Sequence, residues 1–434
     1  MKQWILIWLL AAANICHGQL YFPPTTGSTW DTLAPETQGW CKERIDSLSS
    51  YLAARNTDAF IVLVDGKIVI EKYFGTFTAD SAHYWASASK SLTATLTGIA
   101  QERGMLQISD TVSDWLGNGW TVAPAAKERA ITIRHLLTMT SGLNDTVSAP
   151  CDNEDTSAAC LRYLADAGTR WAYHTGAYRK LLTVISAASG LGINTFTNNY
   201  VGATTGITGL WYNGMFYSKP RSMARFGLLA LNKGVWGADT VLHDTAYFQA
   251  MVNTSQPYNP AYGYLWWLNG KSSYLSPGSQ YVFSGTLVPN APADMYCALG
   301  KNDQKIYVVP SRKMVVIRTG ESAYGVAMAF SPFDNELWGK IDSLGYHCPT
   351  AVATTTKALP FVYPNPAHHQ AVIAYAGQQF ALTLYDAMGR VALHRANCTD
   401  TTTIDCHSLA PGLYVAELIS PQGDVQRMKV VVER

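Results

Sequence analysis

Residues 85–100 read Trp-Ala-Ser-Ala-Ser-Lys-Ser-Leu-Thr-Ala-Thr-Leu-Thr-Gly-Ile-Ala, and this stretch decides both the fold and the chemistry that we expect. Leu92, Leu96 and Ile99 recur at helical spacing, and Gly104 follows where such a helix would end. The helix opens on Ser87 and Lys90. Because residues three positions apart lie on one face of a helix, the Ser87 hydroxyl and the Lys90 amine are expected to meet.

Ser87 and Lys90 are the residue types of a nucleophile and its general base, respectively. A serine hydroxyl becomes reactive when a neighbour takes its proton, and a buried lysine, whose pKa is lowered by desolvation, is able to do so. Ser-x-x-Lys occurs once in the chain, which is about the number expected by chance. Ser89 is a rival nucleophile, but no lysine follows it at the required spacing.

Segments on both sides of this helix predict strands. Residues 60–71 are two apolar runs around Asp65-Gly66, the signal of a type I′ hairpin. Residues 305–310 and 313–318 return to strand composition near the other end of the same region. Strands from both ends with helices between them predict one antiparallel sheet, which is an α+β arrangement.

Four blocks in order carry a resemblance to a known family. Residues 85–100 resemble the nucleophile segment of the serine β-lactamase and penicillin-binding-protein-like superfamily. The blocks at 131–143, 222–229 and 262–268 are similar to its class C-type branch, which includes esterases, D-amino-acid peptidases and oligoamide hydrolases. The resemblance spans roughly residues 40–345. It implies a β-lactamase-like fold, an antiparallel sheet plus a helical subdomain, and an acyl-enzyme mechanism that needs neither cofactor nor metal.

The second motif of this family is Tyr-x-Asn or Tyr-x-Ser, and residues 173–175 supply it as Tyr-His-Thr. The resemblance implies that Tyr173 is the general acid and base that relays protons between the nucleophile and Lys90. Thr175 keeps a hydroxyl but lacks the amide of Asn, and it is a candidate substrate-binding residue. Tyr178 is the competing tyrosine.

The third motif, Lys-Thr-Gly, His-x-Gly or Trp-Gly-Gly, has no good match. Alignment on residues 308–310 places Ala298 and Gly300 at that strand, where a backbone N–H near Ala298 would complete an oxyanion hole with that of Ser87. Family members use the motif's cation to hold a substrate carboxylate. Lys301 lies near but out of register, which counts against penicillin-like substrates.

The last segment has a different texture, with period-2 alternation between frequent turns, which predicts a small all-β sandwich. Four of its stretches resemble the C-terminal sorting domain of the type IX secretion system. The family implies export by a Bacteroidetes-type bacterium and a partner in the secretion machinery. A generic binding sandwich is the alternative. The four stretches are residues 363–366, 384–390, 412–415 and 429–432.

The N-terminus and the cysteines point to export. Residues 4–13 are apolar, follow a single lysine and are too few to span a bilayer, so we predict a signal peptide over residues 1–18. A lipid anchor on Cys16 is a minor alternative. An oxidising compartment permits disulfides, although sequence does not determine their pairing. The suggested pairs are Cys151–Cys160, Cys398–Cys406 and Cys41–Cys348, which leave Cys297 over.

These observations divide the chain into residues 1–18 (signal peptide), 19–350 (hydrolase), 351–359 (linker) and 360–434 (sorting domain). Hydrophobic residues make up 48% of the chain, and Lys+Arg 32 against Asp+Glu 31 leaves a charge of +1, which argues against a nucleic-acid binder. We predict a serine hydrolase that is secreted or held at the cell surface and acts on small esters, amides or peptides. A true β-lactamase or D-peptidase, and an inactive binding protein of the same fold, are the alternatives.

Three further features allow two interpretations each. His135 invites a Ser-His-Asp triad, but it lies in an apolar helical block and no Gly-x-Ser-x-Gly occurs, so a structural histidine is favoured. The acidic residues 152–155 would suit a cation or a solvated loop, and the loop is favoured. Trp266 and Trp267 either line a pocket or fill the core.

Overall fold

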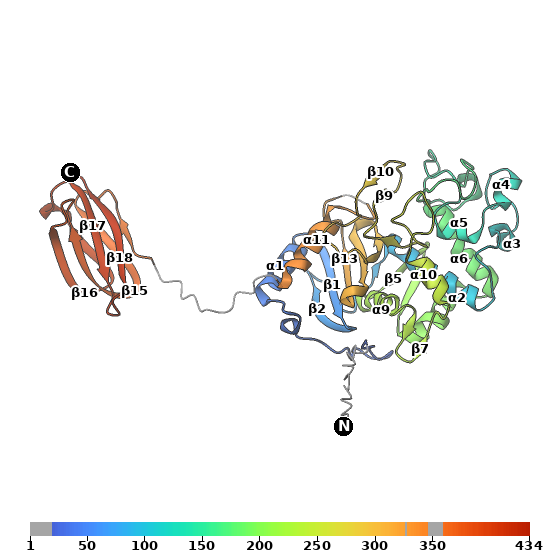
Figure 1. Cartoon of the computed structure of the whole chain (residues 1–434), viewed down its shortest axis with the longest axis horizontal. Coiled ribbons are helices and arrows are strands. Elements are labelled where there is room, and N and C mark those ends of the chain that lie inside the picture. The colour runs from blue at the N-terminus through green and yellow to red at the C-terminus, as the bar shows by residue number, and fades with distance from the viewer. Residues whose placement is uncertain (1–19, 326–327, 346–358) are drawn as a thin grey trace, which may run out of the picture. The chain divides into compact units, whose positions relative to one another are not determined.

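The computed structural model describes residues 20–325, 328–345 and 359–434. The chain forms two compact units, Met1–Cys348 and Pro349–Arg434, and Figure 1 shows their elements. The predicted signal peptide and residues 351–358 of the predicted linker lie outside the described residues. No helix within the described ranges has the length and apolar composition that a bilayer crossing requires.

The first unit is built on a six-stranded antiparallel sheet with strands from both ends of the unit, as predicted. Its central strands are nearly continuous apolar runs, because both faces of the sheet are covered. In spatial order the strands are β2 (Lys67–Tyr73), β1 (Thr57–Val64), β13 (Met314–Gly320), β12 (Gln304–Val309), β11 (Tyr296–Gly300) and β8 (Trp267–Leu268).

The β1–β2 hairpin confirms the prediction for residues 60–71. Val64 pairs with Lys67, so the loop has two residues. Asp65 and Gly66 have φ of 50° and 81°. This left-handed pair is the geometry that Asp-Gly favours in a type I′ turn.

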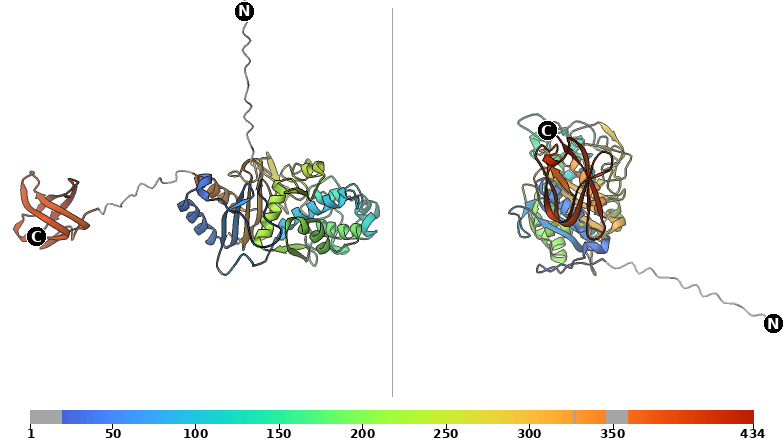
Figure 2. Two further views of the ribbon diagram at one scale, coloured as in Figure 1. Left: turned by 90° about the horizontal axis from the view of Figure 1, so that it is seen from below. Right: turned by 90° about the vertical axis from the view of Figure 1, so that its left-hand side faces the viewer.

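Helices pack on opposite faces of the sheet. Ile306 and Tyr307 are neighbours in β12, so their side chains point to opposite faces. Ile306 lies near Gly227 of α9 (Pro220–Leu231), whereas the Tyr307 ring meets Trp338 of α11 (Pro332–Asp342) edge-on, with 5.6 Å between centroids. α1 (Lys42–Ala53) shares the face of α11, since Tyr51 stacks on Phe333. Figure 2 shows the sheet edge-on between these layers.

A helical subdomain lies beside the sheet, as the resemblance implied. Its central helix, α2 (Ser89–Glu102), is buried from Ser89 to Ala100 and packs against α6, α10 and β11. Gly104, with φ of 67°, follows the helix as predicted. The other helices are α3 (Val112–Leu116), α4 (Ala125–Arg129), α5 (Ile133–Leu137), α6 (Thr175–Ser189), α7 (Ile193–Thr197), α8 (Ala203–Thr205) and α10 (Thr245–Met251).

Three small sheets complete the first unit. The one nearest the site has the order β3-β5-β4, and its middle strand β5 runs beside the segment that carries Ser87. The strands are β3 (His83–Tyr84), β4 (Gly209–Tyr212), β5 (Met215–Ser218), β6 (Val235–Trp236), β7 (Asp239–Thr240), β9 (Ser273–Leu275) and β10 (Val282–Ser284).

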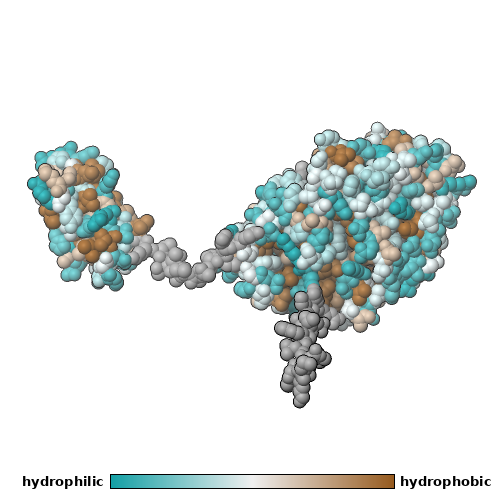
Figure 3. Space-filling model, viewed as in Figure 1, coloured by the Kyte–Doolittle hydropathy of each residue, from teal (hydrophilic) through white to brown (hydrophobic). Residues whose placement is uncertain are grey.

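The second unit is all-β, as predicted, and its strands form one hydrogen-bonded antiparallel sheet that curls around a separate core. Buried and exposed positions alternate along β17, which is the period-2 pattern of the sequence. Figure 3 shows apolar patches on the visible face of this unit. The strands are β14 (Phe361–Tyr363), β15 (Gln370–Tyr385), β16 (Val391–Asp405), β17 (Gly412–Ile419) and β18 (Val425–Val432).

The cysteines confirm part of the predicted pairing. Cys151 and Cys160 form a disulfide, and Cys297 is free and buried. The suggested Cys398–Cys406 pair is wrong, because both thiols are free. Eight residues of nearly extended chain at about 3.3 Å each hold the two residues much farther apart than the ~7 Å a disulfide tolerates. Cys41 is disulfide-bonded, and its suggested partner Cys348 lies outside the described residues.

Candidate active site

Ser87 lies in a short 3-10 turn, η2 (Ala86–Ala88), that leads directly into α2. The preceding Ala86 has φ of 48°, a left-handed conformation that is unusual for alanine and that points to a turn held by its surroundings. Trp85 anchors this turn, because its amide donates to Phe216 O and its indole to Ser218 Oγ, both in β5. Ser87 is half-buried while the residues around it are buried.

Lys90 meets Ser87 as the spacing predicted. Lys90 Nζ lies 2.9 Å from Ser87 Oγ and 3.4 Å from Thr175 Oγ1, and only 1% of Lys90 is exposed. Burial holds the pKa of Lys90 well below its ordinary value. The nearby cations Arg179 and Lys301 lower this pKa further, whereas Glu154 raises it. A lysine in this state carries a neutral amine that is able to accept a proton.

Ser89, the rival nucleophile, is fully buried, and its hydroxyl accepts a hydrogen bond from Phe216 N at 2.9 Å. It therefore joins α2 to β5. Its side chain is not among those that line the pocket around Ser87.

Tyr173 is brought beside Lys90, although 83 positions separate them in the chain. Lys90 Nζ lies 4.7 Å from the centre of the Tyr173 ring. Burial raises the pKa of the Tyr173 phenol, and a hydrogen bond with Ser87 opposes that rise. The ring stacks on Trp267 at 5.8 Å and meets Trp171 and Tyr262 at 6.2 and 6.1 Å. This aromatic cluster fixes its orientation.

Tyr178, the competing tyrosine, also lies against Lys90, with Nζ 4.2 Å from its ring centre. Its hydroxyl donates to Gly214 O at 3.1 Å, and burial raises the pKa of the phenol to about 12. Both tyrosines therefore wall the lysine, and Tyr173 is the one whose pKa the Ser87 hydroxyl lowers. Thr175 begins α6 and lines the same pocket.

Strand β11 passes next to the turn that carries Ser87. A Cβ added to Gly300 would lie 2.4 Å from Trp85 O and 3.0 Å from Ala86 Cβ, so glycine is what permits this approach. Ala298 is buried in the same strand, where it pairs with Ile306. Strand β8 pairs with Tyr296 and Cys297 of β11, which leaves the stretch from Ala298 to Gly300 beyond the end of β8.

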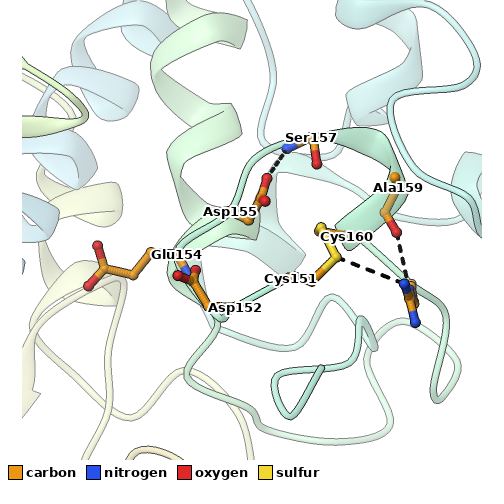
Figure 4. Close-up of a disulfide and its surroundings, with 8 residues drawn as sticks. Cys151, Asp152, Glu154, Asp155, Ser157, Ala159 and Cys160 are labelled. Atoms are coloured by element: carbon orange, nitrogen blue, oxygen red, sulfur yellow. Dashed lines mark hydrogen bonds between the residues drawn. A yellow bond between two sulfur atoms is a disulfide. The ribbon is translucent and has the colours of Figure 1, made fainter. Parts of the chain in front are cut away.

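Three charged side chains span the pocket mouth. Glu154 accepts from Arg179 Nη2 at 3.0 Å and lies 3.4 Å from Lys301 Nζ. It stands on the loop closed by the Cys151–Cys160 disulfide, and Figure 4 shows its side chain pointing away from the sulfur atoms. The pocket beneath is a narrow cleft of about 10 Å³ of free volume. It is lined by Ala86, Ser87, Lys90, Glu154, Thr175, Tyr178, Arg179, Met215 and Lys301.

Sequence reasoning missed Glu154 and Arg179 as pocket residues and set Lys301 aside as out of register. Lys301 follows directly after β11, so its long side chain reaches the site without occupying a strand position. The cysteines that bracket residues 152–159 were the available signal for Glu154. For Arg179 the signal was its position one turn after Thr175 on the same helix.

The remaining features are structural. His135 is half-buried and its Nδ1 accepts from Thr132 N at 3.1 Å, which caps α5 as a structural histidine would. Trp266 and Trp267 are buried and fill the core. Asp152 and Asp155 accept from the backbone amides of Glu154 and Ser157, so these carboxylates stabilise turns of the loop.

Family comparisons agree with this geometry. Residues 46–331 match the family model described as Beta-lactamase. The chain belongs to the beta-lactamase family. Residues 361–433 match the model of the secretion system C-terminal sorting domain. That domain indicates type IX secretion, and so a secreted or cell-surface protein of a Bacteroidetes-type bacterium.

Individual relatives are distant. The putative penicillin-binding protein PbpX of Bacillus subtilis (strain 168) is 29% identical over 185 residues, which cover 38% of this chain and 44% of that protein. The match thus spans less than half the length of this curated relative. A putative 6-aminohexanoate-dimer hydrolase from Bacillus anthracis has a TM-score of 0.56 at 16% identity, over 75% of this chain and 90% of that one. A family VIII carboxylesterase has a TM-score of 0.51 at 12% identity, over 71% and 99%.

At these identities the structural likeness shows the fold alone. Members of the beta-lactamase family are generally hydrolases, and the fold neighbours include proteins described as a carboxylesterase and a putative 6-aminohexanoate-dimer hydrolase.

Proposed function

We propose that this protein is an exported serine hydrolase that forms an acyl-enzyme on Ser87 with small ester, amide or peptide substrates. The observation that carries the proposal is the 2.9 Å contact between Ser87 Oγ and a buried Lys90 whose pKa is lowered by burial. A half-buried serine beside a neutral amine is the arrangement that acyl transfer requires.

The proposed reaction has two steps. In acylation, Ser87 Oγ attacks the substrate carbonyl while its proton passes to Lys90 Nζ, and Tyr173 protonates the leaving alcohol or amine. In deacylation, water attacks the acyl group while the Tyr173 phenolate takes one proton from that water, and Lys90 returns its extra proton to Ser87 Oγ as the acid leaves, so that all three groups regain their starting states. Backbone amides of Ser87 and of the β11 stretch near Ala298 and Gly300 are the proposed donors to the oxyanion, where one donor contributes about 100-fold or more in rate.

Labelling with a fluorophosphonate probe tests the nucleophile. We expect wild-type protein to be labelled and Ser87→Ala to be unlabelled, with the adduct mapped to Ser87 by peptide mass. Lys90→Ala should abolish labelling as well, while its circular dichroism spectrum stays that of a folded protein.

The matched control is Ser89→Ala, because Ser89 lies two residues away but is buried against β5. This variant should keep labelling if it folds. Labelling that persists in Ser87→Ala would contradict the proposal, because another residue would then be the nucleophile. Folded wild type that is never labelled would also contradict it and would favour an inactive binding protein.

A second candidate, β-lactam or D-peptide hydrolysis, is favoured by one observation. Lys301 and Arg179 both line the Ser87 pocket, and such cations suit the carboxylate of these substrates. Glu154 already pairs with both, which ranks this candidate below neutral esters. Nitrocefin turnover as fast as that of p-nitrophenyl acetate would reverse the ranking.

A further inference from the structure

The disulfide-bonded loop of residues 151–160 lies directly on the segment that carries Tyr173 and Thr175. The Cα atoms of Cys151 and Cys160 are 5.4 Å apart, so the bond closes the eight residues between them into a tight loop. One residue of this loop, Glu154, lines the pocket of Ser87. The preceding residue, Asn153, contacts the segment that carries Tyr173 and Thr175.

Asn153 uses its whole side chain to hold backbone groups. Its Nδ2 donates to Tyr173 O at 3.0 Å and to Asp145 O at 2.9 Å, and its Oδ1 accepts from Thr175 N at 2.7 Å. Tyr173 O and Thr175 N lie on either side of His174 in the chain. The side chain therefore acts as a clamp on the backbone of Tyr173 and Thr175.

The loop backbone adds a second attachment to the same segment. Asn153 O accepts from Gly176 N at 2.7 Å. A Cβ added to Gly176 would lie 2.0 Å from Asp155 O, so the loop and the start of α6 touch with no room for a side chain. Arg179, on the same helix, donates to Glu154 O at 2.9 Å. Three positions of the segment, 173, 175 and 176, thus have their backbone held by or packed against this loop.

We propose that Asn153 is a positioning residue for the Tyr173–Thr175 segment, and that the Cys151–Cys160 loop is part of the active site because it holds Asn153 in place. This inference rests on the proposed Ser87 acyl-enzyme. Tyr173 must meet Ser87 and Lys90 within hydrogen-bonding reach, and an error of about 1 Å in such a placement costs on the order of 100-fold in rate.

The first test is Asn153→Ala in the full-length chain, measured in pre-steady-state experiments as the saturating acylation rate and the dissociation constant Ks of the noncovalent complex with p-nitrophenyl acetate. We expect the acylation rate to fall by about tenfold or more, with Ks changed by less than about threefold because Asn153 does not line the pocket. Asn194→Ala is the matched control. Asn194 clamps the amide and carbonyl of one residue, Trp211, in the same manner, and neither lines the Ser87 pocket.

The second test separates the loop contact from the stability of the Asn153 variant. Gly176→Ala forces the loop and α6 apart and leaves Asn153 intact, so it should lower the acylation rate in the same direction. Gly192→Ala, at a glycine with open space around it, should have no effect. If Asn153→Ala does not fold, the Gly176→Ala result decides.

A folded Asn153→Ala or Gly176→Ala protein that acylates within twofold of wild type would overturn the inference. Loss of rate accompanied by an equal rise in the dissociation constant Ks of the noncovalent complex would also overturn it, because positioning of Tyr173 acts on the chemical step. Failure of the proposed function is distinguishable, since it would appear as labelling that survives Ser87→Ala in the otherwise wild-type protein.

Discussion

Lys90 is the residue on which the proposed chemistry depends, and its protonation state is set by burial and by three charges at the pocket mouth. Burial is the largest cause of its lowered pKa, Arg179 and Lys301 add to it, and Glu154 opposes it. Because Glu154 pairs with both cations, the three side chains act on Lys90 as a unit. Removing one of these charges should therefore shift the pKa of Lys90 and leave the reacting atoms in place.

The charges predict opposite shifts of the pH profile. Lys90 works as a base when neutral, so the acylation rate rises with pH through the pKa of Lys90. Glu154→Gln removes a charge that raises this pKa, and the acid limb of kcat/KM should move to lower pH. Lys301→Gln removes a charge that lowers it, and the limb should move to higher pH.

The control for this pair is Glu336→Gln, because Glu336 is bound to Tyr51 and Tyr324 and is not among the charges that act on Lys90. Its acid limb should coincide with that of wild type. Shifts of Glu154→Gln and Lys301→Gln in the same direction would contradict the assignment of Lys90 as the titrating base.

At the scale of elements, the site exists because three segments converge on one turn. The turn η2 presents Ser87, the segment that leads into α6 presents Tyr173 and Thr175, and β11 passes within contact distance of Trp85 and Ala86. β5 holds the turn from the side through Phe216 and Ser218. β11 approaches the backbone of this turn directly, and the approach is possible because Gly300 has no side chain.

Gly300→Ala should damage the site more than the fold. The new methyl group would meet Trp85 O at 2.4 Å, and since a backbone atom cannot swing aside, β11 or the Ser87 turn must shift. We expect probe labelling to slow by about tenfold or more, while the far-ultraviolet circular dichroism spectrum is unchanged. Gly192→Ala provides the control, and labelling of Gly300→Ala at the wild-type rate would show that this approach does not matter.

At the scale of the whole molecule, the chain contains two separate hydrophobic cores. The first includes the central sheet and α2, and the second lies inside the curled sheet of residues 361–432. The site residues all belong to the first unit. The second unit matches a sorting domain.

Removal of residues 349–434 should therefore leave the rate of probe labelling unchanged and abolish export of the protein through the outer membrane. We expect the shortened protein to react with the probe at the rate of the full chain and to unfold at the same temperature in calorimetry, because its core is intact. In the native host it should be retained inside the cell envelope, as measured by fractionation. A loss of labelling on truncation would show that the second unit supports the site.

Much of this was predictable from short-range patterns. The β1–β2 hairpin, helix α2 and the Ser87–Lys90 contact follow from spacings of two, three and four residues, because each depends on backbone geometry within one element. The Cys151–Cys160 pair was suggested by short separation. The Cys398–Cys406 suggestion failed because a strand extends a similar separation, eight residues against nine, instead of folding it back.

The sequence by itself determined that the chain carries a serine–lysine pair at the start of a buried helix, an α+β unit around it and an all-β unit after it. Only the tertiary structure decided which distant side chains complete the pocket. Lys301, Arg179 and Glu154 meet through long side chains from three separate segments, and Asn153 holds a motif 20 residues away through backbone atoms. Such contacts leave no periodic trace in a sequence, because they depend on how whole elements pack.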